Sequence, residues 1–205
     1  GIIEDGYRNI IAIGGDGTFR GATDLSVRGI PCIGLPGTID NDITATDYTI
    51  GYDTAMNTVL ELCGRLRDTS ESHARCTVVE VMGRNAGYIA LETGIALNAI
   101  GIAIQEVNFD KEALFEKMIA ARKDGRRSFI VVVAEGLGSA FAQALTKEIE
   151  EKTGIEARYN CPAHIVRGGT PTLRDRVLAS VMGDKAVDLL LAGKSDVVIC
   201  SRNNE

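Results

Sequence analysis

Short runs of apolar residues, many of them β-branched, alternate along the chain with longer stretches in which apolar residues recur every three or four positions. The short runs predict strands, and the longer stretches predict helices that bury one face. The predicted strands are 9–13, 31–35, 76–81, 101–104, 128–134, 156–161 and 196–200. The predicted helices are 52–67, 86–97, 111–123, 138–153 and 173–192. This alternation predicts an α/β fold with mainly parallel sheets and flanking helices.

The composition is that of a globular protein. Of 205 residues, 45% are hydrophobic and 24% are charged, which allows a sizeable core. No run of about 18 apolar residues predicts a membrane span, and no basic segment followed by an apolar one predicts a signal peptide. The five cysteines are odd in number and widely spaced, which predicts buried, reduced thiols rather than disulfides or a metal site. We therefore expect a cytoplasmic protein with no membrane partner.

The charge balance narrows the class of ligand. The chain has 22 basic and 28 acidic side chains, a net charge of -6, which argues against non-specific binding to nucleic acid. Most of the basic residues are arginines, whose planar guanidinium binds phosphate oxygens at two points. The arginines therefore favour a phosphorylated small molecule as ligand, and surface ion pairs are the alternative explanation for any one of them.

Polar motifs follow five of the predicted strands, after Ile13, Leu35, Val81, Ala134 and Cys161. In parallel α/β sheets, ligands bind outside the carboxyl ends of the strands. The motifs therefore predict one site built from several loops.

The first motif is the glycine-rich turn Gly14–Thr18. Glycines allow the backbone to approach phosphate oxygens closely, and the first amides of a helix supply donors. Asp16 in this turn could hold a Mg²⁺ ion bound to phosphate. The alternative is a strand-to-helix turn that needs glycine only for its geometry.

The second motif is the loop Pro-Gly-Thr-Ile-Asp-Asn-Asp at 36–42. Its two carboxylates, Asp40 and Asp42, are one residue apart and can divide two tasks. One can accept the proton of an attacking hydroxyl while the other holds a metal ion. A turn rich in Asp and Asn, capping the next element, is the alternative.

Four arginines flank or lie within predicted strands and turns. Arg84 and Arg167 lie in glycine-containing turns, where a binding role is the favoured interpretation. Arg75 and Arg158 would each, taken alone, be interpreted as surface charge.

Two further side chains end predicted strands or begin turns. Glu135 ends an apolar strand and precedes Gly136, so we interpret it as a site carboxylate that accepts hydrogen bonds from hydroxyls, with a helix cap as the alternative. His164 alone is more often a structural histidine than a ligand.

Taken together, the motifs at 13–18, 36–42 with 46–51, 79–84 and 164–169 resemble those of the bacterial ATP-dependent 6-phosphofructokinases. The resemblance covers nearly the whole chain. The glycine–aspartate turn is shared with NAD kinases and lipid kinases, whereas the other motifs are specific.

The resemblance implies parts of two Rossmann-like domains. Residues 1–51 would be a partial nucleotide-binding domain, 52–163 a domain that binds fructose 6-phosphate, and 164–205 a segment that returns to the nucleotide-binding domain. The family's opening segment, with its own ATP-binding loop, and its far C-terminal segment have no counterpart here. We therefore expect the sequence to be a fragment of such an enzyme.

The implied activity is the glycolytic transfer of the γ-phosphoryl group of ATP to the C1 hydroxyl of fructose 6-phosphate, which yields fructose 1,6-bisphosphate and ADP. Asp40 would be the base, Arg84 would stabilise the transferring group, and Thr38 would help to hold the sugar and the transferred phosphoryl group. The residues that would contact fructose 6-phosphate are Thr38, Asp40, Arg75, Met82, Gly83, Arg84, Glu135, Arg158, His164 and Arg167. Those that would contact ATP are Gly15, Asp16, Gly17, Thr18 and Gly21, and those that would serve Mg²⁺ are Asp16 and Asp42.

Within the resemblance, Arg75 and Arg158 match arginines that act in a neighbouring subunit, which implies a homotetramer. Gly17, Gly21 and Gly37 leave room for a nucleotide, which favours ATP over pyrophosphate as the donor. A pyrophosphate-dependent phosphofructokinase and a non-catalytic protein that binds sugar phosphates are the alternatives.

The allosteric site of the family is altered in this sequence. Arg67 and Arg126 match basic residues of the effector pocket. The positions of an acidic metal ligand, a lysine and a histidine hold Ile100, Asp124 and Ser128 instead. We therefore expect weak or absent regulation by ADP or phosphoenolpyruvate.

Overall fold

A computed structural model describes residues 4–203. The chain divides into two compact units. Unit 1 combines Gly1–Asp53 with Pro171–Glu205, and unit 2 is Thr54–Thr170. The chain thus leaves unit 1 after Asp53 and returns at Pro171, so that residues 164–170 belong to unit 2. The ligand expected for each domain stays a prediction.

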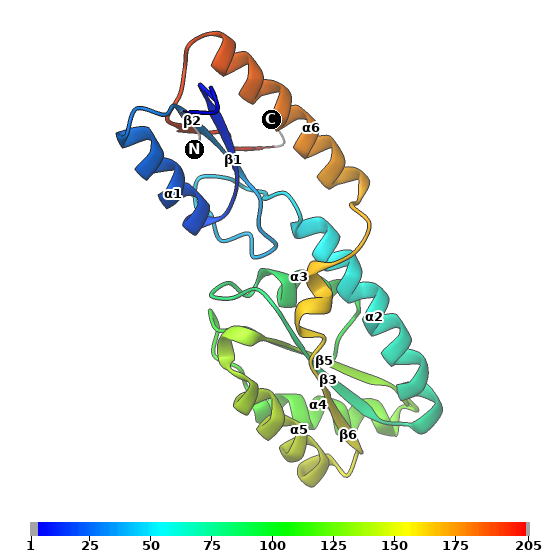
Figure 1. Ribbon diagram of the computed structural model, residues 1–205. Coiled ribbons are helices and arrows are strands. Elements are labelled where there is room, and N and C mark those ends of the chain that lie inside the picture. The colour runs from blue at the N-terminus through cyan, green and yellow to red at the C-terminus, as the bar shows by residue number, and fades with distance from the viewer. Residues whose placement is uncertain (1–3, 204–205) are drawn as a thin grey trace. The chain divides into compact units, whose positions relative to one another are not determined.

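Unit 1 is built on a parallel sheet in the order β1-β2-β7, with β1 (Ile10–Gly14), β2 (Cys32–Pro36) and β7 (Val197–Val198). Figure 1 shows helices α1 (Asp16–Val27) and α6 (Leu173–Leu191) on either side of β1 and β2. Successive side chains of a strand point to opposite faces. Ile33 and Leu35 accordingly pack with Met182 and Ala186 of α6, whereas Gly34 makes room for Phe19 of α1.

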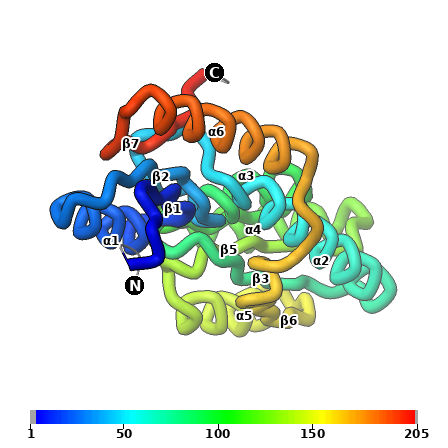
Figure 2. Tube along the Cα trace, turned by 45° about the horizontal axis from the view of Figure 1, so that its top comes forward, coloured from blue at the N-terminus to red at the C-terminus, as the bar shows by residue number. Residues whose placement is uncertain are grey.

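Unit 2 contains a four-stranded parallel sheet in the order β4-β5-β3-β6. The strands are β3 (Cys76–Val81), β4 (Gly101–Ala103), β5 (Phe129–Ala134) and β6 (Ala157–Asn160), and the helices are α2 (Tyr52–His73), α3 (Tyr88–Ala96), α4 (Lys111–Lys123) and α5 (Ser139–Thr153). Helix α5 runs beside β3 and β6 (Figure 1, Figure 2). Strands β3 and β5 are buried along their whole length, as expected for a parallel sheet covered on both faces.

The core of unit 2 lies between its sheet and the pair α4 and α5. Met118 of α4, Leu145 and Ile149 of α5, and Phe129 and Val131 of β5 pack in one cluster and are almost completely buried. This cluster fixes β3 and β5 side by side, with Val81 opposite Ala134. Their carboxyl ends, and the turns that follow, are therefore neighbours.

The predicted strands and helices are confirmed, with shifts at their ends. Helix α2 continues six residues beyond the predicted end, to His73. The segment after Arg67 is polar and shows no apolar repeat, but the buried Ser70 hydroxyl lies 2.6 Å from the Thr77 hydroxyl and ties the last turn to β3. Among the described residues, no helix is both long and apolar enough to span a membrane.

The expectation of five buried thiols is wrong for two of them. Cys32, Cys63 and Cys76 are buried, whereas Cys161 is exposed and Cys200 is half-buried. Both lie just beyond the paired part of a strand, where the chain leaves the core. Burial raises the pKa of Cys63 to about 11 and that of Cys76 to about 12.

Candidate functional site

The two polar motifs of unit 1 lie side by side. Strands β1 and β2 are parallel neighbours, and beyond them the Gly37 N–H donates to the Gly14 carbonyl over 3.0 Å. A Cβ placed on Gly15 would lie 3.7 Å from the Cβ of Thr38. The glycine-rich turn and the 36–42 loop thus form one polar edge of the sheet.

The glycine-rich turn leads directly into α1. The helix begins at Asp16 with Gly15 at its N-cap, so the amides of its first turn lie at the end of β1. Gly14 approaches Thr18 so closely that a Cβ there would lie 2.2 Å from the Thr18 hydroxyl oxygen. A Cβ on Gly17 or Gly21 would meet no atom within 4 Å. Close packing therefore requires a glycine at position 14, whereas Gly17 and Gly21 border open space.

Buried Thr49 fixes the loop that carries Asp40. The Thr49 hydroxyl donates to the Thr38 carbonyl over 2.7 Å, and Asn41 Oδ1 accepts from the Thr49 N–H over 2.9 Å. The Asp40 N–H in turn donates to the Thr38 hydroxyl over 3.2 Å. These bonds hold Asn41 at a φ of 51°. Neither Thr49 nor Asn41 was predicted as a site residue, although both lie within the motifs at 36–42 and 46–51.

The carboxylates expected to serve Mg²⁺ come from both motifs. Asp16 begins α1, and Asp42 ends the segment that Thr49 and Asn41 hold. Among residues 4–203, no group of three or more His, Cys, Asp or Glu side chains could hold a metal ion. Mg²⁺ typically takes one or two carboxylates and completes its shell with water and substrate phosphate. Two carboxylates beside a phosphate-type turn fit that donor set.

In unit 2, Glu135 holds the turn that contains Gly83 and Arg84. It follows β5 at the start of the short helix η1 (Glu135–Leu137). Its Oε1 accepts from the Gly83 N–H over 3.1 Å and from the Arg84 N–H over 2.6 Å. The expected contact between Glu135 and sugar hydroxyls stays a prediction.

The same turn has an unusual backbone. Gly83 has a φ of 145°, and a Cβ at this position would lie 2.5 Å from the Ala86 carbonyl oxygen. Arg84 has a φ of 56°, a conformation that costs a non-glycine residue about 1–3 kcal/mol. Because Glu135 binds both N–H groups, it offsets this cost and leaves the Arg84 side chain exposed.

Three of the expected sugar contacts line one small cavity in unit 2. Met82, Glu135 and His164 border a space of about 70 Å³. The other lining residues are Glu80, Val81, Cys161 and Ala163. His164 and Arg167 both belong to the short helix η2 (Ala163–Arg167), and both are exposed. Glu80 and Cys161 were not predicted as site residues.

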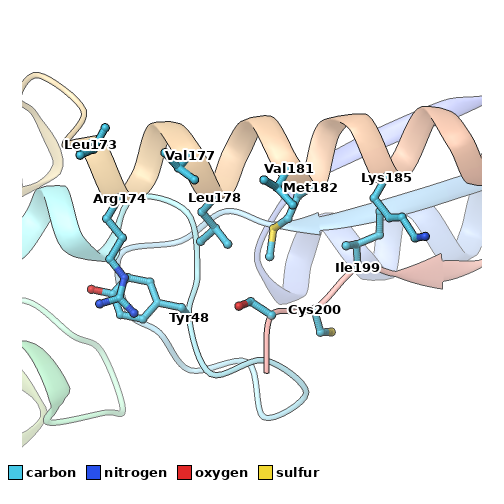
Figure 3. A pocket seen from close by; sticks show the side chains of 11 residues that line it. Tyr48, Leu173, Arg174, Val177, Leu178, Val181, Met182, Lys185, Ile199 and Cys200 are labelled. Carbon is cyan, nitrogen blue, oxygen red and sulfur yellow. The ribbon is translucent and has the colours of Figure 1, made fainter. Parts of the chain in front are cut away.

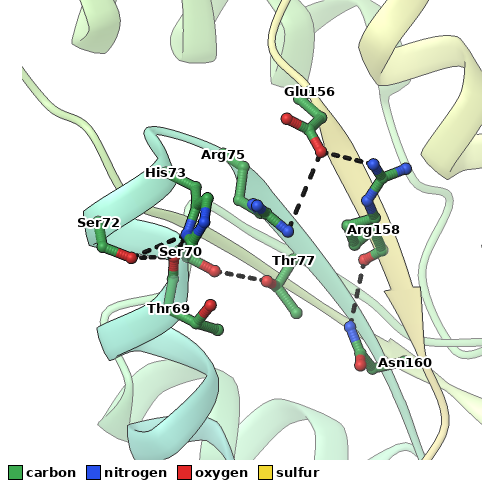
Figure 4. A network of polar contacts seen from close by, with 9 residues as sticks. All are labelled: Thr69, Ser70, Ser72, His73, Arg75, Thr77, Glu156, Arg158 and Asn160. Carbon is green, nitrogen blue, oxygen red and sulfur yellow. Dashed lines mark hydrogen bonds and ion pairs between the residues drawn. The ribbon is translucent and has the colours of Figure 1, made fainter.

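Arg75 and Arg158 lie at the other end of the same sheet. Arg75 precedes β3, and Arg158 pairs with Thr77 near the start of that strand. Glu156 Oε1 lies 2.6 Å from Nη2 of Arg158 and 4.0 Å from Nη1 of Arg75, so the carboxylate is shared between the two guanidinium groups (Figure 4). The two arginines therefore lie near the start of β3, whereas the cavity lined by His164 lies at the end of that strand.

The two expected effector residues converge on the segment after α3. A guanidinium N–H of Arg67 donates to the Leu97 carbonyl. Arg126 donates to the Asn98 carbonyl over 3.2 Å and to that of Ser128 over 2.9 Å. Both side chains therefore bind backbone in this structure, and their role toward an effector stays a prediction.

A larger apolar cavity in unit 1 lies between α6 and the segment after β7. Its volume is about 650 Å³, and its lining includes Leu173, Val177 and Val181 (Figure 3). At its end, the Arg174 guanidinium stacks over the Tyr48 ring at 3.6 Å. The helical spacing predicted Leu173, Val177 and Val181 as one apolar face, and all three are exposed. The buried face of α6 instead carries Met182 and Ala186.

The chain is similar in sequence to a protein family and to several bacterial enzymes. The profile of the family "Phosphofructokinase" matches residues 2–190. The chain is 52% identical over 198 residues to the "ATP-dependent 6-phosphofructokinase" of Brevibacillus brevis, with 96% of this chain and 61% of that protein covered. It is also 52% identical over 199 residues to "ATP-dependent 6-phosphofructokinase 1" of Clostridium perfringens, with 97% and 62% covered.

A solved structure agrees with these relatives. The phosphofructokinase of Saccharomyces cerevisiae superimposes with a TM-score of 0.90 at 31% identity and covers all of this chain and 31% of its own. The chain spans 61% and 62% of the length of the two bacterial relatives. The family match over nearly the whole sequence, together with this likeness of fold, shows that the chain belongs to the phosphofructokinase family.

Proposed function

We propose that this chain is part of an ATP-dependent 6-phosphofructokinase, which transfers the γ-phosphoryl group of ATP to the C1 hydroxyl of fructose 6-phosphate. The observation that carries the proposal is the turn in which Glu135 binds both the Gly83 and the Arg84 N–H. It presents an arginine at the sheet edge where Met82 and His164 line a cavity. Two bacterial relatives of that name, each 52% identical, support the assignment.

Asp40 is the proposed general base. It takes the proton from the C1 hydroxyl while that oxygen forms a bond to the γ-phosphorus and the bond from the γ-phosphorus to the bridging oxygen of ADP breaks. Thr38 contacts the sugar and the transferring group. The bonds from Thr49 to Thr38 and Asn41 support this role, because a base must be held in position before the reaction starts.

Arg84 is proposed to stabilise the negative charge on the transferring phosphoryl group. Electrostatic stabilisation by preorganised groups dominates this chemistry. The φ of 56° at Arg84 and the two bonds to Glu135 support the role. These two bonds fix the backbone of the turn that carries Arg84 before substrate binds.

Unit 1 is proposed to bind the donor. Gly15, Thr18 and the first amides of α1 bind phosphate oxygens of ATP, and Gly17 and Gly21 leave room for the nucleotide. Asp16 and Asp42 would hold Mg²⁺, which when bound with ATP neutralises phosphate charge. The open space beside Gly17 and Gly21 favours ATP over pyrophosphate.

Unit 2 is proposed to bind the acceptor. Met82, Gly83 and Glu135 contact the sugar, and His164 and Arg167 bind the 6-phosphate. Arg75 and Arg158 serve a neighbouring subunit in a cytoplasmic homotetramer. The two arginines lie at the opposite end of β3 from the His164 cavity. This position supports the proposal that they bind sugar phosphate in a neighbouring subunit and not in the cavity of their own unit.

Calorimetric titration with fructose 6-phosphate tests the acceptor half of the proposal. The protein is the complete gene product that carries this sequence, and the variants are Arg167→Ala and, as a control, Arg122→Ala, whose guanidinium binds carbonyls at the end of α5. We expect specific binding that Arg167→Ala removes and Arg122→Ala leaves unchanged. Folded protein that binds no fructose 6-phosphate would contradict the proposal.

A further inference from the structure

Glu80 is a buried carboxylate at the carboxyl end of β3. Only 5% of its surface is exposed. Its Oε1 accepts from the Ser139 hydroxyl over 2.7 Å, and its Oε2 accepts from the Tyr159 hydroxyl over 2.6 Å. A carboxylate is costly to bury unless its oxygens are hydrogen-bonded. Each oxygen of Glu80 has such a donor.

The two donors come from different segments. Ser139 is the first residue of α5, immediately after the turn that starts with Glu135, and Tyr159 lies in β6. Ser139 and Tyr159 are 59 and 79 residues away from Glu80 along the chain. One side chain therefore ties together the end of β3, the start of α5 and β6.

Each of these three segments leads into a residue of the same cavity. The end of β3 leads to Met82, the turn before α5 contains Glu135, and the segment after β6 contains His164. Glu80 also lines that cavity. A shift of any one segment would therefore change the spacing of the three side chains around it.

We propose that Glu80 is a positioning residue for the sugar-phosphate site, acting through Ser139 and Tyr159 to set the spacing of Met82, Glu135 and His164. This inference rests on the proposed function, because it assigns the same cavity to fructose 6-phosphate. Glu80 itself takes no part in the phosphoryl transfer. It fixes the geometry of residues that bind the acceptor.

The state of Tyr159 supports this arrangement. Burial and, after it, the hydrogen bond to Glu80 raise the pKa of Tyr159 to about 12. Because an ordinary tyrosine ionises at about pH 10, the raised pKa keeps this phenol a hydrogen-bond donor to Glu80 further into the alkaline range.

The test uses variants of Glu80 and of its two hydroxyl donors in the complete gene product. Tyr159→Phe and Ser139→Ala each delete one donor to Glu80, and Glu80→Gln keeps the shape of the acceptor without its charge. The matched control is Thr146→Val, which removes a buried hydroxyl that donates to the Ala142 carbonyl within α5.

We expect Tyr159→Phe to raise the KM for fructose 6-phosphate about tenfold while kcat and the KM for ATP stay within about twofold. Because both hydroxyls act through Glu80, the effect of Tyr159→Phe should be smaller in the Glu80→Gln background than in the parent. Thr146→Val should leave every kinetic constant within about twofold. A KM unchanged in both Tyr159→Phe and Glu80→Gln, or changed equally in Thr146→Val, would overturn the proposal.

Labelling of Cys161 gives a second readout that does not depend on activity. Cys161 is exposed, lies two residues after Tyr159 and lines the same cavity. We expect the rate at which a neutral thiol reagent labels Cys161, followed by mass spectrometry of its peptide, to differ at least about threefold between Ser139→Ala and the parent or Thr146→Val, because loss of an anchoring bond displaces the segment that carries this thiol. Equal rates in all three proteins would contradict the positioning role.

The two readouts distinguish the inference from the proposed function. Fructose 6-phosphate should slow Cys161 labelling in the parent if the cavity binds it. A parent protein with neither this protection nor kinase activity would refute the proposed function, while the labelling rates of the variants would still decide whether Glu80 positions the segment after β6.

Discussion

The Oε1 atom of Glu135 lies 2.6 Å from the backbone nitrogen of Arg84 and holds this arginine in a left-handed conformation. The acceptor and the donor come from the ends of neighbouring parallel strands, β5 and β3, whose register places Ala134 beside Val81. The relationship makes the position of Arg84 depend on a carboxylate 51 residues away.

Removal of this carboxylate should impair catalysis. We expect Glu135→Ala to lower kcat/KM for fructose 6-phosphate at least about 100-fold. Without the bonds from Glu135, the turn relaxes and Arg84 moves away from the phosphoryl group that it stabilises in the transition state. Glu135→Gln, which can still accept from both amides, should lose less. The control is Glu148→Gln, which removes only a half-exposed ion pair with Lys111 and should change kcat/KM by less than about twofold. Equal activities of Glu135→Ala and Glu148→Gln would contradict this role of Glu135.

Gly83 should tolerate no side chain. Gly83→Ala combines a φ of 145° with a Cβ 2.5 Å from the Ala86 carbonyl oxygen, so we expect the free energy of unfolding to fall by about 2–4 kcal/mol. Gly64→Ala in α2, where a Cβ meets open space, should be neutral or stabilising by up to about 1 kcal/mol. Urea denaturation of both variants measures the difference, and an equal effect of the two substitutions would show that the turn is not constrained as described.

Thr49 should matter for turnover although it is buried away from solvent. Thr49→Val removes the hydroxyl that binds the Thr38 carbonyl, and we expect a loss of about 1–3 kcal/mol in stability together with a fall in kcat at least about tenfold. Thr93→Val removes an equally buried hydroxyl, which donates to the Ile89 carbonyl of its own helix. It should lower stability without changing kcat, as steady-state kinetics of the two variants will show.

Alkaline pH should destabilise the fold through its buried thiols. The folded-state pKa values of Cys63 and Cys76 are raised from 9.0 to about 11 and about 12. Between the unfolded and the folded values, the unfolded chain binds fewer protons than the native protein, so stability falls as pH rises. We therefore expect the free energy of unfolding to be lower at pH 10.5 than at pH 8, with a smaller decrease in Cys76→Ala. A decrease of the same size in parent and variant would assign the pH dependence to other groups.

The sequence predicted most strands and helices of the fold, but fewer of the contacts within the site. Periodicity found the strands and the helices from α2 onward, because apolar spacing along one segment reports which face is buried. It gave no range for α1, whose described residues include none that is buried. Periodicity missed the last six residues of α2, where the buried Ser70 hydroxyl is hydrogen-bonded to that of Thr77. It also grouped Leu173 with Val177 as one apolar face of α6, because a helical repeat does not say which apolar residues find a partner.

Within the site, local motifs were informative and long-range contacts were not. Glycine content marked the turns at Gly14 and Gly83, since each requires a residue without a Cβ. The contact of Glu135 with Arg84 and that of Glu80 with Tyr159 join residues 51 and 79 positions apart. Nothing in the sequence near Glu80 indicates that its partners would be hydroxyls from α5 and β6.

The most direct test of the account is the kcat of Asp40→Asn in the complete gene product. The control is Asp47→Asn, an exposed carboxylate in the same loop region that accepts from the Asn203 N–H. We predict that Asp40→Asn lowers kcat by about 10²–10⁴-fold, as expected when a general base is lost, with the KM for fructose 6-phosphate changed far less, and that Asp47→Asn stays within about threefold of the parent. A kcat of Asp40→Asn within about threefold of the parent would contradict the assignment of Asp40 as the base.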